Sequence, residues 1–583
     1  MDTKDPDKEP ESPPEVSFHP LNIGLWPGIN TRLIRISTLV WAFVGLGVVI
    51  RSVRYLVKFP IWPDEAFLAA NFIDAGWRDM LGALDYHQVA PLLFVWAEFL
   101  VVRLIGFTEY SLRLLPFICG IGSVFLFLHL CRRILKGSPL LLATAIFAVS
   151  YYPIRHGAEI KPYAVDLFIS LILTIMAVEW LRKPSRTGWL WGLAGITPLA
   201  IGISFPAVFV AGGVSLGLLF RIFSGGGKKS RRLTPYIIFN LALIGAFILF
   251  FTISIGVQYK SEAWLHGPDP KTETFNDASA WVKAFPPFDN PIHLALWLID
   301  LHTGNMFAYP NGGMNGASTM TFICFITGAL VLLRRKRGKV LIILIAPFLP
   351  AFIAAALHKY PYGYNTRFTL YLAPAICLLA GLGAARLMAF IRPDRTRRIV
   401  FAAFLLILAV SGAGIIIKDL LQPYKKVEDM NSRDYGRRLW REEGRNAELV
   451  CVYRDLGLEF FPRLFQWGHS ARYLCNQVIY SPEHRYGPRT IRWDKISRDH
   501  PLRCVIFSVP DCYEPYASRD DDAWNKWLNN MEKRYEISGY QKDELNPGIE
   551  SHDEIYEIYD FVPKTAGSAG EDPAGMGGPL PPD

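Results

Sequence analysis

Two adjacent acids follow the first long apolar stretch of the chain, within the segment Ile61-Trp62-Pro63-Asp64-Glu65-Ala66-Phe67. A charged side chain at the centre of a bilayer costs about 2.5–3.5 kcal/mol. Asp64 and Glu65 therefore belong in a watery loop or a protein-lined cavity, where an ionisable group is a candidate functional residue. The same Pro-Asp-Glu order would also begin an ordinary interfacial helix. Taken alone, the two acids leave both interpretations open.

The composition indicates an integral membrane protein. Of the 583 residues, 51% are hydrophobic and only 19% are charged, and the mean hydropathy is +0.22. Soluble domains carry about 25% charged residues. The net charge of +9 gathers in short loops between apolar segments, as the positive-inside rule describes. We therefore interpret the charge as a signal of topology and expect no nucleic-acid partner.

Eleven apolar segments are predicted to cross the membrane: 36–57, 112–131, 139–154, 163–181, 188–204, 206–222, 235–257, 318–333, 340–357, 367–390 and 399–417. This number places the N-terminus inside and the C-terminus outside. The basic loops agree with it, because these groups then all fall on the cytosolic side: Arg182/Lys183/Arg186, Lys228/Lys229/Arg231/Arg232, Arg334 to Lys339, and Arg392 to Arg398.

One further apolar segment, residues 89–106, is short for a span and carries Glu98 and Arg103. It is predicted to be an amphipathic helix at the outer interface. The fold class expected is thus a polytopic α-helical membrane protein with outer interfacial helices. Its predicted divisions are a disordered cytosolic N-terminus, a transmembrane domain, an extracytoplasmic α/β domain and a disordered tail, at residues 1–32, 33–417, 418–563 and 564–583.

The C-terminal α/β domain is predicted from short apolar runs. Buried strands are expected at 449–453, 504–509 and 554–559, and helices around 432–443 and 521–533. Because this domain is predicted to be extracytoplasmic, one or two disulfides are expected among its four cysteines, with the pairing left open: Cys451, Cys475, Cys504 and Cys512.

The predicted topology brings polar residues from three loops to the outer face. They are Asp64, Glu65 and His87 of loop 58–111 with Arg113 just after it, Arg155, Glu159, Lys161 and Tyr163 in and after loop 155–161, and Tyr362 and Arg367 in and after loop 358–366. Basic residues are normally in excess in cytosolic loops, so their presence on the outer side needs an explanation. A ligand phosphate would explain them, and so would anchoring of the helices at the headgroup layer.

Several motifs in these loops resemble those of a known family. They are Trp62-Pro-Asp-Glu-Ala66, Tyr86-His-Gln-Val-Ala-Pro-Leu92, Gly106-Phe-Thr-Glu-Tyr-Ser-Leu-Arg-Leu-Leu-Pro116, Glu159-Ile-Lys-Pro-Tyr163 and Tyr360-Pro-Tyr-Gly-Tyr-Asn-Thr-Arg367. Their order and common side resemble the GT-C fold glycosyltransferases that use polyprenyl-phosphate sugars. Within that group, the chain looks like bacterial relatives of the protein O-mannosyltransferases and of the lipid A aminoarabinose transferase. The resemblance covers about residues 35–390.

The resemblance implies an inverting glycosyltransferase in the bacterial cytoplasmic (inner) membrane, with its site at the outer face. It implies that Asp64 is the base for a protein, lipid or glycan acceptor and that Glu65 supports it. Lys161 and Arg367, and less directly Arg155, would stabilise the departing lipid phosphate. The remaining substrate-binding candidates are His87, Arg113, Glu159, Tyr163 and Tyr362. No nucleotide cofactor is expected.

Some family members hold a divalent metal ion. Here its ligands would be Asp64, His87 and Glu159, with one histidine of loop 258–317: His266, His293 or His302. The chain also departs from the family, because it reads His87-Gln-Val-Ala-Pro91 where the protein-modifying relatives show His-Pro-Pro.

Two other functions compete with glycosyl transfer. The alternative is a transporter or flippase for a lipid-linked envelope precursor. It is disfavoured because the spans lack internal repeats and their charges gather on one outer face. A third is a non-catalytic assembly or ligase protein of the envelope.

Overall fold

The computed structural model describes residues 19–23, 35–73, 75–223, 230–260, 283–313, 316–443, 450–453, 464–480, 501–508, 528–529, 531–547 and 554–564. The chain divides into two compact units. We call the first, Met1–Val57, Ala90–Glu98 and Arg113–Leu421, the helical unit, and the second, Lys58–Val89, Phe99–Leu112 and Gln422–Asp583, the mixed unit. The sequence does not predict that residues 58–89 and 99–112 group with the C-terminal segment.

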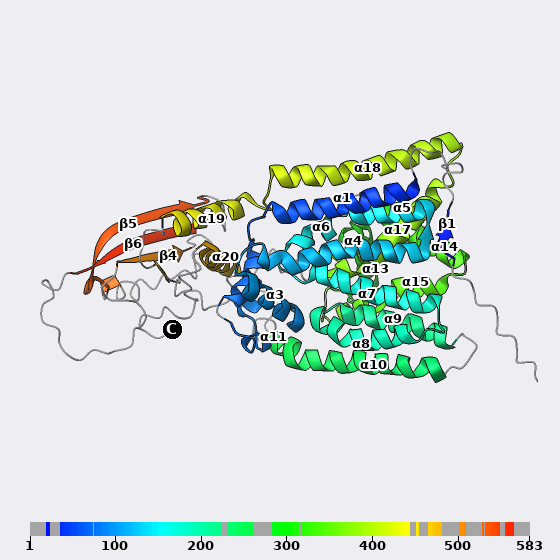
Figure 1. The fold of residues 1–583 in the computed structure, drawn as a ribbon, viewed down its shortest axis with the longest axis horizontal. Helices are drawn as coiled ribbons and strands as arrows, with labels where there is room; N and C mark the ends of the chain where they lie inside the picture. Colours follow the sequence, from blue (N-terminus) through cyan, green and yellow to red (C-terminus); the bar gives the residue numbers. More distant parts are fainter. Residues whose placement is uncertain are drawn as a thin grey trace, which may run out of the picture. The chain divides into compact units, whose positions relative to one another are not determined.

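The helical unit consists largely of apolar helices that pack side by side (Figure 1). They are α1 (Ile36–Leu56), α4 (Leu114–Ile134), α5 (Gly137–Ala148), α6 (Tyr151–Arg155), α7 (Tyr163–Arg182), α8 (Gly188–Ile203), α9 (Ala207–Phe223), α10 (Ser230–Phe250), α11 (Gly256–Lys260), α13 (Pro291–Thr303), α14 (Gly316–Arg334), α15 (Gly338–Ile345), α16 (Phe348–Ala356), α17 (Ala373–Met388) and α18 (Asp394–Leu421).

The predicted polytopic helical architecture is confirmed, but the number of helices that pass as spans is lower than eleven. In the described part of the chain, eight helices are long and apolar enough to cross a membrane, or nine if the bent pair Gly137–Ala148 and Tyr151–Ala158 counts as one span. The two remaining predicted spans are the shorter helices α8 and α9. The predicted interfacial segment forms α3 (Leu92–Ile105), of 14 residues, in which Glu98 is buried and Arg103 exposed.

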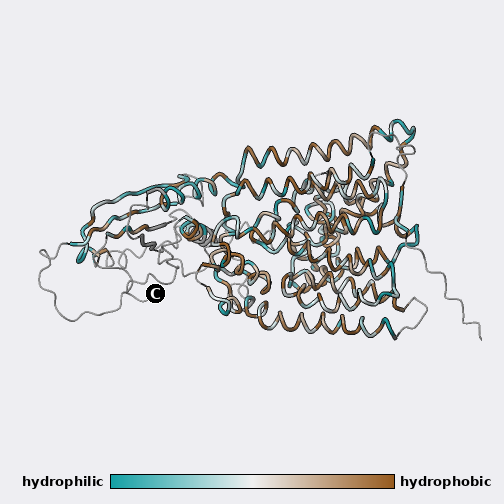
Figure 2. The backbone as a smooth tube through the Cα atoms, in the orientation of Figure 1, coloured by the Kyte–Doolittle hydropathy of each residue, from teal (hydrophilic) through white to brown (hydrophobic). Residues whose placement is uncertain are grey.

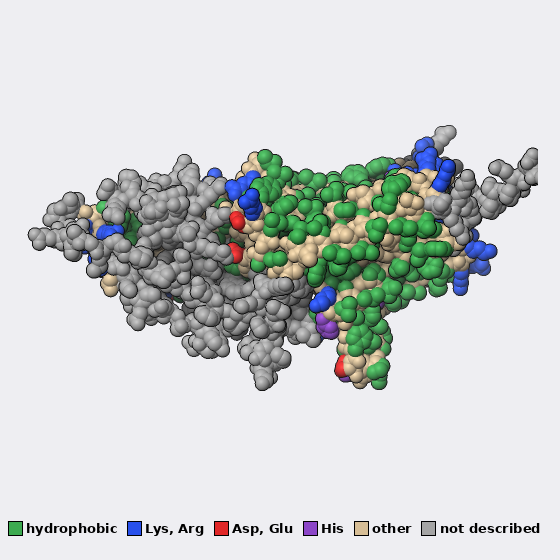
Figure 3. All heavy atoms as spheres, turned by 90° about the horizontal axis from the view of Figure 1, so that it is seen from below, with side chains coloured by type: hydrophobic (Ala, Val, Ile, Leu, Met, Phe, Trp, Pro, Cys, Tyr) green, Lys and Arg blue, Asp and Glu red, His purple; other side chains and the backbone are tan. Residues whose placement is uncertain are grey.

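The core of the helical unit lies around α17. In the helical segment Thr366–Met388, 94% of the apolar membrane-spanning stretch is buried inside the protein. The corresponding shares are 17% for Arg231–Gln258 and 22% for Asp394–Leu421. α10 and α18 are therefore peripheral helices whose apolar side chains face outward. Figure 3, viewed from the side of α10, shows hydrophobic side chains over much of the flank of this unit, as expected for a surface in contact with lipid.

The two ends of the helical unit carry its polar residues. We name the Lys161 end after the segment between α6 and α7, and the Arg221 end after the last turn of α9. The described helix ends that flank the predicted cytosolic basic loops lie together at the Arg221 end (Figure 1). Figure 2 shows hydrophilic residues at these turns and hydrophobic residues along the helices between the ends.

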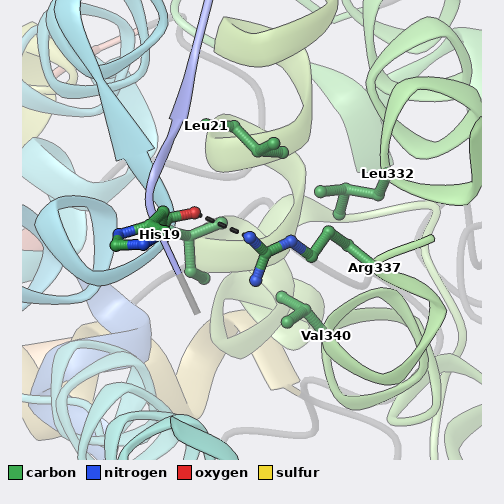
Figure 4. A pocket seen from close by; sticks show the side chains of 6 residues that line it. His19, Leu21, Leu332, Arg337 and Val340 are labelled. Atoms are coloured by element: carbon green, nitrogen blue, oxygen red, sulfur yellow. Dashed lines mark hydrogen bonds between the residues drawn. The ribbon is translucent and has the colours of Figure 1, made fainter. Parts of the chain in front are cut away.

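Residues 19–23 also lie at the Arg221 end, although a disordered segment is expected there. Leu21–Asn22 (β1) pairs in parallel with Leu135–Lys136 (β2) in the turn between α4 and α5. The backbone carbonyl of His19 accepts a 2.8 Å hydrogen bond from Arg337. Figure 4 shows the small pocket at this point, which is lined by His19, Leu21, Ile134, Leu332, Arg337 and Val340.

The mixed unit contains α2 (Pro63–Ala69), α19 (Val427–Arg437), α20 (Leu464–Tyr480) and a four-stranded sheet in the order β3-β4-β6-β5. The strands are β3 (Val450–Tyr453), β4 (Leu502–Ser508), β5 (Tyr535–Leu545) and β6 (Glu554–Pro563). β3 and β4 are parallel, and the other pairs are antiparallel. α19, α20 and the sheet share a core formed by Tyr435, Leu439, Trp440, Tyr473, Val505, Tyr556 and Ile558.

The expected C-terminal strands β3, β4 and β6 are present, whereas β5 and α20 are not predicted from the sequence. Of the expected helix at 521–533, residues 528–529 and 531–533 are described; 528–529 and 531–532 are helical, and 533 lies in a turn. Cys475 and Cys504 are free thiols, which excludes the predicted pairings that include either of them. Cys512 and the side chain of Cys451 lie outside the described residues.

Candidate functional site

The acidic pair lies in the first turn of α2, in the mixed unit. Trp62 has an extended backbone and forms the N-cap, and Pro63 fixes the first helical position. Asp64 is half-buried, whereas Glu65 is 0% exposed. Of the two acids, only Asp64 has a solvent-accessible side chain.

Glu65 lies on the side of α2 that packs against α20. The thiol of Cys475 on α20 donates to the carbonyl of Ala66 at 3.8 Å. Burial and the nearby charge of Glu65 raise the pKa of the Cys475 thiol, which therefore stays protonated. The C-terminal part of the chain thus supports the helix that presents Asp64.

A buried network fixes α20 in turn. Arg472 donates to Asp429 of α19 at 2.6 Å and also pairs with Glu554 of β6. Glu554 accepts a hydrogen bond of 2.8 Å from the hydroxyl of Tyr556. Arg472, Asp429 and Glu554 are each at most 2% exposed, so this network is a rigid support.

The segment that contains His87 is tied to α2 through Asn71. The amide of Asn71 donates to the carbonyl of Phe67 at 2.9 Å, and its oxygen accepts from the backbone N–H of Asp85 at 2.7 Å. The rings of Phe67 and Tyr86 lie 5.8 Å apart. The side chain of His87 itself lies outside the described residues. Asn71 is a positioning residue that no sequence motif indicates.

In the helical unit, the segment between α6 and α7 forms a buried ionic cluster at the Lys161 end. Glu159, only 2% exposed, accepts from Arg155 at 3.2 Å and from His156 Nδ1 at 2.8 Å. Lys161 is 6% exposed. His156 belongs to the predicted outer loop 155–161 but is given no role from the sequence, although its spacing of three residues from Glu159 is a detectable signal.

The second predicted segment meets this cluster through aromatic side chains. The Tyr163 ring lies 5.1 Å from His156 and 6.1 Å from Phe368, and the guanidinium of Arg367 lies 4.8 Å from the Phe368 ring. On the next turns, Ser170 donates to the carbonyl of Tyr371 at 2.7 Å. Two segments about two hundred residues apart in sequence are therefore adjacent.

Tyr362 lies apart from this ionic cluster, in an aromatic group. It is 4% exposed and packs against Trp297, Phe352 and His302. Its hydroxyl lies 3.4 Å from His302 Nε2, while His302 Nδ1 lies 2.7 Å from the carbonyl of Leu298. Burial raises the pKa of Tyr362 and lowers that of His302, so both groups are neutral at pH 7.

Arg113, which ends the short helix Ser111–Arg113, is 3% exposed at the start of α4. The acid of the same motif, Glu109, belongs to the mixed unit and pairs with Lys58 at 2.7 Å. A role for Arg113 in substrate binding stays a prediction.

The predicted metal ligands do not form a metal site among the described residues, where no group of three His, Cys, Asp or Glu side chains comes together. The oxygens of Glu159 are bonded to Arg155 and His156. His293 is exposed beside Asp289, and His266 lies outside the described residues. The side chain of His87 also lies outside the described residues, so a metal site that includes His87 stays a prediction.

No protein-family model and no curated protein sequence matches the chain. Among solved structures, it is similar to ArnT from Cupriavidus metallidurans in the apo state, with a TM-score of 0.48 and 12% identity over 92% of this chain and 99% of that one. For the structure of ArnT from Cupriavidus metallidurans bound to undecaprenyl phosphate, the TM-score is 0.46 and the identity 12%, over 91% of this chain and 99% of that one.

The chain is also similar to the oligosaccharyltransferase AglB from Archaeoglobus fulgidus in complex with an inhibitory peptide and a dolichol-phosphate. The TM-score is 0.42 and the identity 11%, over 69% of this chain and 58% of that one. ArnT and AglB are GT-C glycosyltransferases, the group that the sequence motifs resemble. At these values the similarity says nothing about the substrates or activity of this chain.

Proposed function

We propose that the protein is an integral-membrane, inverting glycosyltransferase that moves a sugar from a polyprenyl-phosphate donor to an acceptor. The observation that carries the proposal is the meeting, in the helical unit, of the two cation-bearing segments around Lys161 and Arg367. Both segments belong to motifs that resemble the same family, and the contact between Tyr163 and Phe368 joins them.

The chemistry of this end suits a departing phosphate. Breakage of the bond between the sugar and the phosphate leaves extra negative charge on the phosphate oxygens. Lys161 is 6% exposed, so its charge acts in a low-dielectric environment where attraction is stronger than in water. Arg155 pairs with Glu159 at 3.2 Å, and Lys161 and Arg367 are the proposed phosphate-binding cations.

Asp64 is the proposed general base. The acceptor O–H or N–H gives its proton to Asp64 while its oxygen or nitrogen forms a bond to C1 of the sugar. The bond from C1 to the phosphate oxygen breaks, and its electron pair leaves with the polyprenyl phosphate. Glu65 is 0% exposed, and its role is to hold α2 against α20.

We place this reaction at the outer face of the bacterial cytoplasmic membrane. The basic loops gather at the Arg221 end, and the positive-inside rule assigns such loops to the cytosol. The Lys161 end then faces outward, where no nucleotide sugar is present.

The first test is transfer or hydrolysis of radiolabelled polyprenyl-phosphate sugars by the full chain in lipid, with Asp64→Asn as the variant. Removal of a general base lowers the rate by about 10²–10⁴-fold, while donor binding and thermal unfolding stay as in the wild type. Glu65→Gln is the matched control, with unfolding as its main change. If Asp64→Asn turns over at the wild-type rate, the proposal is wrong.

A further inference from the structure

A second group of cations lies at the Arg221 end of the helical unit. Arg221 occupies the last turns of α9, Arg232 the first turn of α10, and Lys339 the first turn of α15. Arg221 and Arg232 are half-buried and Lys339 is exposed. The proposed glycosyl transfer uses none of these residues.

Close packing of α9 on α15 determines where Arg221 and Lys339 lie. A Cβ atom on Gly213 would lie 2.5 Å from the backbone nitrogen of Pro347, and one on Gly217 would lie 2.6 Å from the side chain of Ile343. Gly217 lies four residues after Gly213 on α9, and its contact Ile343 lies four residues before Pro347, the contact of Gly213. The two segments are therefore antiparallel. One more step of four residues on each segment brings Arg221 opposite Lys339.

α10 adds the third cation from the other side of α9. The hydroxyl of Ser215 lies 3.0 Å from that of Tyr236 and 2.6 Å from the side-chain oxygen of Asn240. Arg232 lies one turn before Tyr236, toward the same end as Arg221. Arg221 is close enough to both Arg232 and Lys339 for their like charges to interact.

In the part of the chain that the structure describes, these three cations differ from other cations at the Arg221 end because no carboxylate pairs with them. Elsewhere at this end, Glu179 pairs with Arg133 at 2.5 Å and with Arg182 at 3.0 Å. Among the described residues, no Asp or Glu forms an ion pair with Arg221, Arg232 or Lys339. Three cations that helix packing holds close together repel one another. A bound anion would offset this repulsion and stabilise the group.

The surroundings of the group indicate what this anion is. Exposed apolar side chains border the cations, namely Phe220 at 56%, Phe223 at 63% and Ile237 at 47%. α10 is a candidate span with 17% of its apolar window buried, so its outer side faces acyl chains. A molecule that offers a phosphate next to acyl chains is a phospholipid.

We propose that Arg221, Arg232 and Lys339 bind the phosphate of an anionic phospholipid at the predicted cytosolic face. The site stands independently of the proposed transfer reaction, because it uses different residues at the opposite end of the helical unit. Glycines 213 and 217 act as positioning residues by allowing α9 to approach α15.

The test uses the full chain in vesicles of dioleoylphosphatidylcholine with traces of spin-labelled phosphatidylglycerol or spin-labelled phosphatidylcholine. Electron paramagnetic resonance measures the fraction of each lipid immobilised by the protein. The wild type immobilises phosphatidylglycerol preferentially, and the variant Arg221→Gln/Arg232→Gln/Lys339→Gln loses that preference by about fivefold or more. The charge-matched control Arg334→Gln/Arg335→Gln/Arg395→Gln, at exposed positions of the same end, keeps it.

Three outcomes would overturn the proposal. Equal losses in the cluster variant and its control would indicate general surface charge. Displacement of the labelled phosphatidylglycerol by millimolar inorganic phosphate would indicate a site for a free anion. If the full chain shows no preference but a variant lacking residues 2–18 does, the acidic N-terminal segment occupies the site.

Discussion

The two ends of the helical unit both gather cations, but they surround them differently. At the Lys161 end, Arg54 and Asp419 pair at 2.6 Å with both side chains only 4% exposed, and Glu159 is buried between its two partners. At the Arg221 end, the partners of Glu179 are His129, Arg133 and Arg182, which are 45%, 36% and 21% exposed. The acids are thus more enclosed at the Lys161 end, where Asp419 and Glu159 are 4% and 2% exposed, than at the Arg221 end, where Glu179 is 10% exposed, although Arg155 is itself 29% exposed.

This difference indicates what each end does. A buried charge interacts strongly with whatever approaches it, because the surrounding dielectric is low. An exposed charge is hydrated and screened, so it contributes to topology and headgroup binding but little to stability. Chemistry on a charged leaving group is therefore expected at the Lys161 end, and lipid contact at the Arg221 end.

The largest effect is expected from breaking the buried pair of the Lys161 end. Arg54→Leu leaves Asp419 of α18 without its partner, and the loss of one member of a buried pair costs about 3–5 kcal/mol. The free energy of unfolding, measured by SDS titration in mixed micelles, reports this loss. The double variant Arg54→Leu/Asp419→Leu removes both charges and recovers most of the stability. A loss below about 1 kcal/mol in the single variant would mean that this end is as solvated as the other.

A comparable effect on activity is expected at Lys161. Lys161→Ala removes one donor to the phosphate in the transition state, which lowers the rate of transfer by about 10²–10³-fold. Lys339→Ala, at the other end, leaves the rate unchanged and serves as the matched control. Single-turnover kinetics with a radiolabelled polyprenyl-phosphate sugar separate the chemical step from donor binding. Equal rates in the two variants would remove the functional distinction between the ends.

The sequence predicts the helices well where the signal is local. The predicted segments 36–57 and 163–181 correspond to Ile36–Leu56 and Tyr163–Arg182, because a continuous apolar run needs no partner to be recognised. α20 escapes prediction because Arg472, Asn476 and Gln477 occupy buried positions in it. β5 is not predicted because its hydrophobic and polar residues alternate only weakly, and because this mostly exposed strand carries Lys542, Asp543 and Glu544.

The candidate site is predictable only in part for a similar reason. Motifs indicate Asp64, Lys161 and Arg367 without any knowledge of the fold. The partner of Arg54 lies 365 residues away in the sequence, and such a pairing depends on packing between α1 and α18. The support of α2 by α20 likewise depends on a helix that the sequence does not reveal.

The smallest effect is expected at Arg133, whose side chain is 36% exposed. Arg133→Ala leaves Glu179 still paired with Arg182 at 3.0 Å, so no buried charge becomes unpaired. A half-exposed pair of this kind contributes about 1 kcal/mol or less, and salt weakens it further. The same SDS titration, repeated in about 0.05 M and about 0.5 M salt, measures the loss of unfolding free energy and its dependence on salt. A loss of several kcal/mol that does not depend on salt would show that this end also encloses its charges, and the contrast between the two ends would disappear.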